Sequence, residues 1–161
     1  MIKTYGLHWR LDRISWGKTG AGHIGTLCGS TTLSAKARPI DFRNQRGIYA
    51  LYADYDLIYI GQTGTNRHRL FDRLKEHMKD HLSERWNRFS WFGTQWVTAG
   101  HKLSCDTAAI HEYMAHTLNI LEAISIAIAE PRLNLQRGKW NAAKRYFQYW
   151  ERSGNEFKDD E

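Results

Sequence analysis

Four side chains in the first half of the chain have the types that hydrolysis of a phosphate ester would use. Arg73 carries a planar cation that can bind a phosphate through two N–H groups and stabilise developing charge. Tyr49 and Tyr59 could orient or deprotonate a water, although a phenol with a pKa near 10 is only about 0.1% ionised at pH 7. They need an imidazole, a cation or a metal nearby, and His77 lies one helical turn after Arg73. Each residue alone is an ordinary strand or surface residue, so the prediction depends on their convergence.

Glu122 is a carboxylate inside the apolar segment 118–129. An unpaired carboxylate there is costly, so Glu122 pairs with a cation such as Arg73, binds a metal or faces a cleft. Residue types alone favour the ion pair. A single carboxylate can nevertheless hold a catalytic Mg²⁺, because that ion keeps several waters and takes further oxygens from substrate phosphate.

The two tyrosines lie on short apolar segments, 47–53 and 57–63, that predict a β-hairpin with a loop at 54–56. With that loop, residues whose numbers sum to 110 face each other, so Tyr49 lies opposite Gly61 and Tyr59 opposite Leu51. Side chains alternate along a strand, so these four share one face of the hairpin. A slip of one residue would separate the two tyrosines.

A helix is predicted over 67–81. One stripe with a four-residue spacing is apolar and faces the core: Leu70, Leu74 and Met78. The adjacent stripe presents two cations and an imidazole: Arg69, Arg73 and His77. The helix is therefore expected to bring Arg73 and His77 to the tyrosines.

The whole chain, 1–161, is predicted to form one domain. Strands are predicted at 6–10, 13–16 and 89–98, a polar connector at 30–44, and a helix over 107–129 that Pro131 ends. A basic aromatic helix is predicted over 139–150, and an acidic tail over 153–161. The expected fold class is α+β, with a small three-stranded antiparallel sheet flanked by helices.

Composition limits the function classes. The 161 residues carry a net charge of +6 with a pI near 9.4, which suits an anionic partner such as nucleic acid. Two cysteines exclude a disulfide framework, the start lacks a secretory segment, and 118–129 is too short to cross a bilayer. A cytoplasmic location without membrane association is expected.

Two motif look-alikes fail on spacing. Gly17-Lys18-Thr19 lacks the glycine that a phosphate-binding loop needs five residues before Gly17, since Asp12 stands there. The residues His101, Cys105, His111 and His116 lack the close paired spacing of a zinc site.

The pattern resembles the GIY-YIG nuclease superfamily. It comprises Gly47-Ile48-Tyr49, Tyr59-Ile60-Gly61, Arg73, His77, Glu122 and Asn134, spread over about 45–136. The resemblance implies metal-dependent cleavage of phosphodiesters, most often in DNA. The flanks 1–44 and 137–161 have no counterpart in this pattern.

By resemblance, Tyr49 is the general base or water-orienting phenol and Tyr59 its partner. Arg73 stabilises the scissile phosphate, His77 assists a tyrosine, Glu122 binds one Mg²⁺ or Mn²⁺, and Asn134 positions backbone or substrate. Some members carry a lysine shortly after the second tripeptide. Gln62-Thr63-Gly64 stand here instead, so Gly61, Arg67 and Arg69 are the predicted substrate-binding residues.

The sequence therefore predicts a metal-dependent endonuclease. The alternative is a nucleic-acid-binding module with an idle nuclease site. Its binding residues would be Trp91, Trp96, Lys144, Arg145 and Trp150. A third option is a partner-binding protein that uses the amphipathic face of 139–150. DNA versus RNA, target specificity and a homodimer are left open.

Overall fold

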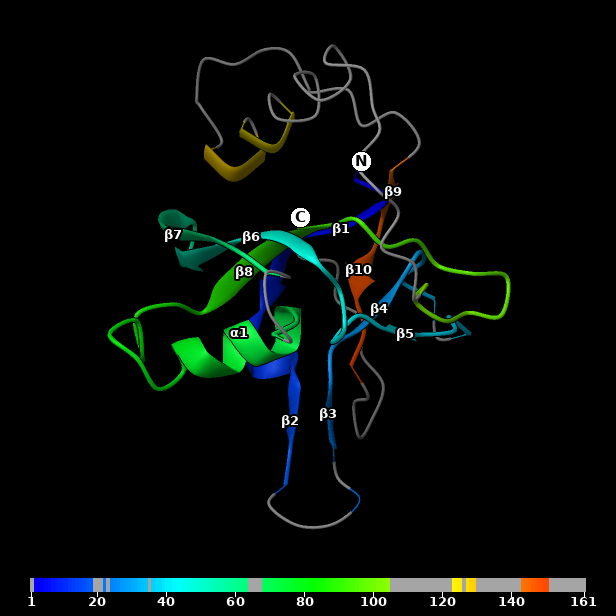
Figure 1. Ribbon diagram of the computed structural model, residues 1–161, viewed down its shortest axis with the longest axis horizontal. Helices are drawn as coiled ribbons and strands as arrows, with labels where there is room; N and C mark the ends of the chain where they lie inside the picture. Colours follow the sequence, from blue (N-terminus) through cyan, green and yellow to red (C-terminus); the bar gives the residue numbers. More distant parts are fainter. Residues whose placement is uncertain are drawn as a thin grey trace.

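The computed structural model describes residues 2–18, 22, 24–34, 36–63, 68–104, 123–125, 127–129 and 143–150 (Figure 1). Strands predominate in this part of the chain. The central sheet has five strands in the order β7 (Asp56–Gln62), β6 (Gly47–Ala53), β8 (Arg88–Gly93), β1 (Thr4–Arg10) and β9 (Lys144–Arg145). Its neighbours pair antiparallel, apart from the parallel pair β1 and β9.

The predicted three-stranded sheet flanked by helices is wrong, because both ends of the chain add strands to it. The sequence predicts a strand at 6–10 but not its place, which is beside β8, with Tyr5 opposite Phe92. The described part of the predicted C-terminal helix, 143–150, is extended and contains β9 and β10 (Phe147–Gln148). Aromatic residues favour strands, and Tyr146 between them is buried in the core.

Two smaller sheets lie beside the central one. β10 pairs with β4 (Cys28–Ser30), which pairs with β5 (Ile40–Asp41) within the predicted connector. β2 (Ser15–Gly17) and β3 (Ile24–Thr26), which follow the short 3-10 helix η1 (Leu11–Arg13), form a separate antiparallel pair. Figure 1 shows this pair extending past α1, away from the central sheet.

Helix α1 (Leu70–His77) is shorter than the predicted 67–81, of which residue 67 lies outside the described residues. Leu70 and Leu74 are buried as predicted, but Met78 is 38% exposed because it caps the end of the helix. After the helix, the Asp80 carboxylate accepts the backbone N–H of Leu82. At the end of the helix, the buried residue is His77 and not Met78.

The two faces of the central sheet bury different clusters. Tyr49, Leu51, Phe89 and Trp91 pack on the α1 side together with Leu70 and Leu74. Ala50, Tyr52 and Phe92 pack on the other side against Ile124 and Ile128, which belong to the helical residues 123–125 and 127–129. Figure 1 shows α1 and these helical pieces on opposite sides of β6 and β8.

Within the described residues, helices that combine the length and the apolar character needed to cross a bilayer are absent.

Candidate active site

The β6–β7 hairpin places Tyr49 and Tyr59 on the same face of the sheet. Tyr49 lies opposite Gly61 and Leu51 opposite Tyr59, so the predicted register at the tyrosines is confirmed. The predicted loop is wrong by one residue, because Asp56 pairs with Ala53 and the turn consists of residues 54 and 55. Leu51 pairs with Tyr59 and Tyr52 pairs with Leu57, so Ile58 is an extra residue in β7. This β-bulge restores the predicted pairing at the tyrosines.

Gly61 makes room for the Tyr49 side chain. A Cβ atom at this position would overlap the Tyr49 hydroxyl and would lie 2.8 Å from Cε1 of Tyr59. The hairpin therefore needs a glycine here so that both rings can lie over β7. The expectation that Gly61 leaves room beside Tyr49 is confirmed, and its substrate-binding role stays a prediction.

A chain of short hydrogen bonds runs from β6 to the end of α1. The Tyr49 hydroxyl lies 2.7 Å from Nε2 of His77, and Nδ1 of His77 lies 2.7 Å from Oδ2 of Asp80. A carboxylate at Nδ1 fixes the proton on that nitrogen, so Nε2 is the acceptor and the phenol donates to it. Tyr49, His77 and Asp80 can thus move a proton from the phenol to the imidazole.

Tyr59 covers this chain on the solvent side. Its ring centroid lies 6.1 Å from that of Tyr49 and 4.8 Å from that of His77. Tyr49 is 0% exposed and His77 3%, whereas Tyr59 is partly exposed. Of the two tyrosines, Tyr59 is the one that a water or substrate can reach directly.

Burial raises the pKa of Tyr49 to about 12, although the neighbouring Arg73 guanidinium acts in the opposite direction and Tyr59 adds to the rise. Burial alone would lower the pKa of Arg73, but Tyr49, Glu76 and Tyr59 outweigh it and raise that pKa. Near neutral pH the phenol is therefore protonated and the guanidinium charged.

Glu76 holds Arg73 in place. Its Oε2 accepts a hydrogen bond from Nη1 of Arg73 at 2.5 Å, and its Oε1 lies 2.5 Å from Nδ1 of His68. Nε of Arg73 is buried and makes no hydrogen bond within the described part of the chain. The Arg73 side chain is 31% exposed, so it can still reach a ligand.

Glu76 and Asp80 are site residues that the sequence reasoning missed. Each is an acidic residue three positions after a residue of the predicted basic stripe, Glu76 after Arg73 and Asp80 after His77. This spacing of three residues is the sequence feature from which the two acidic partners could have been predicted. Burial alone raises the pKa of Asp80, but the N–H of Leu82 and the His77 ring outweigh it, so the pKa is lowered and the carboxylate stays charged.

Of the remaining predicted site residues, the structure describes Arg69. Arg69 is the N-cap residue of α1, where its backbone N–H donates to Asp72 at 3.0 Å. Arg67, Glu122 and Asn134 lie outside the described residues. The structure thus brings together Tyr49, Tyr59, Arg73 and His77, with Glu76 and Asp80 beside them.

The fit of a divalent metal can be examined at the carboxylates of this cluster. Glu76 is engaged by Arg73 and His68, and Asp80 by His77. Groups of three or more metal-binding side chains are absent among the described residues. Ala123 and Ile124, which follow Glu122 in the chain, are buried, and Ile124 packs on the face of the sheet opposite Tyr49. The described residues therefore do not by themselves supply a metal ligand to the cluster.

Comparisons of the chain with family models, with curated proteins and with solved structures give no match. Function is therefore inferred from the geometry of the cluster and from the spacing of the motifs.

Proposed function

We propose that the protein is a divalent-metal-dependent endonuclease of the GIY-YIG kind, which hydrolyses phosphodiester bonds in nucleic acid, with DNA as the first substrate to test. The observation that carries this proposal is the hydrogen-bonded chain from Tyr49 through His77 to Asp80, which lies beside a charged arginine and a partly exposed tyrosine. It combines a proton acceptor with a phosphate-binding cation.

In this proposal the two tyrosines act in series. Tyr59 is the partly exposed phenol, so it orients the attacking water. Tyr49 lies behind it and passes its proton to Nε2 of His77 while it receives the proton of the water through the Tyr59 hydroxyl. The Asp80 carboxylate stabilises the resulting imidazolium, and the leaving alkoxide takes a proton from solvent. A pKa of about 12 makes Tyr49 a poor base by itself, so the imidazole is essential to this path.

Arg73 would stabilise the charge that develops on the phosphate. Its Nη1 is held by Glu76 and its Nε is buried, and the exposed part of the guanidinium would donate to phosphate oxygens. Fixing the guanidinium through a neighbouring carboxylate lowers the reorganisation needed when the substrate arrives.

The proposed metal ligand is Glu122, on the strength of the family resemblance alone. A bound Mg²⁺ or Mn²⁺ would supply a Lewis acid that polarises the phosphate. The geometry of the described residues supports the proposed proton path and the proposed phosphate-binding cation, and the metal requirement is tested separately.

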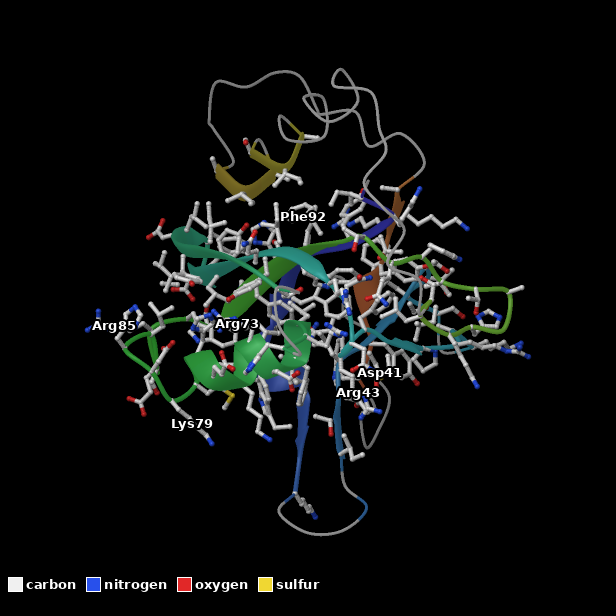
Figure 2. All side chains as sticks on the ribbon, in the orientation of Figure 1. Asp41, Arg43, Arg73, Lys79, Arg85 and Phe92 are labelled. Carbon is white, nitrogen blue, oxygen red and sulfur yellow. The ribbon has the colours of Figure 1, made fainter. Side chains whose placement is uncertain are left out.

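A cleavage assay on plasmid and oligonucleotide DNA tests the proposal. In the presence of Mg²⁺, Arg73→Ala and His77→Ala should each lower the rate by about 10²-fold or more, because each removes a group that acts in the transition state. Arg85→Ala is the matched control, since Arg85 is exposed and lies away from α1 (Figure 2). Glu122→Ala and addition of EDTA should abolish cleavage if the metal assignment holds.

Equal rates in wild type, Arg73→Ala and His77→Ala would overturn this mechanism. Binding of nucleic acid that persists in EDTA, with no cleavage of DNA or RNA in Mg²⁺ or Mn²⁺, would instead identify a binding module with an idle site.

A further inference from the structure

We propose that the groove between the β2–β3 hairpin and α1 binds a single strand of nucleic acid, on the side of α1 opposite the proposed cleavage site. The groove has a volume of about 750 Å³, and its lining includes Trp16, Lys18, Arg43, Phe71, Lys75 and Lys79. We call it the basic groove. The groove and the proposed cleavage site share α1, so this inference extends the proposed function, on which it rests.

The charge of the basic groove selects an anion. Lys18, Lys75 and Lys79 are exposed and make no ion pair with other described residues. Arg43 is partly neutralised, because its Nε lies 3.2 Å from Asp41. Asp72 is the acidic residue in the lining. The three unpaired ammonium groups can bind backbone phosphates as point charges.

An aromatic ring beside these cations favours an unpaired base. Trp16 stays partly exposed at the groove, and its ring packs on Phe71 with centroids 5.3 Å apart and planes at 37°. Bases of a single strand stack on such rings, whereas paired bases in a duplex are not available for stacking. Basic residues interleaved with an aromatic side chain are the usual composition of a single-strand site.

Helix α1 connects the groove with the candidate active site. Lys75 lies on α1, and Lys79 lies in the turn that follows it. Two residues along an α-helix turn through about 200°, so Lys75 lies on the opposite side of α1 from Arg73 and His77. In Figure 2 Arg73 points toward the sheet and Lys79 away from it. A helix with its side chains is about 10–12 Å across, so a strand of a few nucleotides is long enough to reach from the groove to the other side of α1.

The test measures binding in EDTA, where cleavage does not contribute. The probe is a fluorescein-labelled single-stranded DNA, followed by fluorescence anisotropy at several salt concentrations. Lys75→Glu/Lys79→Glu should weaken binding by 10-fold or more and lower the salt slope by about 2, because two phosphate contacts are lost. Lys36→Glu/Lys102→Glu is the matched control with the same charge change, since both residues are exposed and neither lines the groove.

Trp16→Leu tests the stacking component. This variant keeps an apolar side chain against Phe71, and it should weaken binding of the single strand more than binding of the duplex of the same sequence. Its melting temperature reports whether the fold is retained.

Three outcomes would overturn the inference: equal losses in the groove variant and the matched control, no loss in the groove variant, or equal losses for single strand and duplex in Trp16→Leu. Failure of the proposed function is distinguishable from these outcomes. The proposed function is tested by cleavage in Mg²⁺ with Arg73→Ala and His77→Ala. The groove is tested by binding in EDTA with Lys75→Glu/Lys79→Glu, whether or not wild type cleaves the probe.

Discussion

Tyr49 holds its proton more tightly than a tyrosine in water does, because its phenol is buried between β6 and α1. Its pKa rises from 10.0 to about 12, so the folded state keeps the proton over a pH range in which the unfolded chain loses it. Stability contributed by this group is complete below pH 10 and is lost as the pH rises through about 12.

Tyr49→Phe should therefore flatten the fall in stability between pH 10 and about 12. At neutral pH the same change should cost about 1 kcal/mol, because Nε2 of His77 loses its partner. Denaturant unfolding at a series of pH values measures both effects. Tyr55→Phe, at a residue that is 60% exposed, is the control and should follow wild type. A wild-type slope in Tyr49→Phe would contradict the buried phenol.

At the scale of elements, the candidate site could be predicted from local sequence patterns within one hairpin and one helix. Alternation along 47–53 and 57–63 is enough to set which residues face α1, and the register at Tyr49 and Tyr59 is confirmed. The spacing of Arg73 and His77 is likewise a property of one helix. The bulge near Ile58 could not be predicted, because several turn lengths are compatible with the same alternation.

The β2–β3 hairpin is fixed to α1 by a close contact at Gly25. A Cβ atom there would overlap the end of the Phe71 ring and would lie 2.5 Å from the carbonyl oxygen of Ser15. Gly25→Ala should force the hairpin away from α1, at a cost of about 1–3 kcal/mol, and should weaken binding of single-stranded DNA at the basic groove. Thermal unfolding and the anisotropy assay measure these effects.

Gly100→Ala is the matched control for Gly25→Ala, since the nearest atom to its Cβ would be Oγ1 of Thr98 at 3.8 Å. This variant should retain the wild-type stability and affinity. If Gly25→Ala behaves in the same way, the hairpin does not depend on its close approach to Phe71.

At the scale of the whole molecule, the predicted three-stranded sheet is wrong because of contacts between parts of the chain that are far apart in sequence. The five-stranded sheet requires β9 to lie beside β1, which brings Arg145 opposite Tyr5. A local sequence pattern cannot predict a pairing between residues so far apart in the chain. The aromatic segment 144–150 is also as compatible with the periodicity of a helix as with that of a strand. The flanks that the motif pattern leaves out therefore complete the sheet.

The contribution of the C-terminal strands to the sheet can be tested at Tyr146. It is 3% exposed, its ring centroid lies 4.7 Å from that of Phe42, and its carbonyl accepts a hydrogen bond from Nε1 of Trp9 at 3.1 Å. Its N–H donates to the carbonyl of Tyr5 at 2.7 Å. Removal of a buried aromatic ring costs about 3 kcal/mol or more, so Tyr146→Ala should lower Tm by roughly 6–12 °C in one cooperative transition.

Tyr149→Ala is the control for this prediction, because that ring is partly exposed and should matter less. Far-ultraviolet circular dichroism and cleavage activity should fall together with temperature in Tyr146→Ala, since the C-terminal strands and the tyrosine hairpin belong to one sheet. If Tyr146→Ala melted in two steps, with the tyrosine hairpin still folded after the first, the C-terminal strands would be an appendage to an independently stable core.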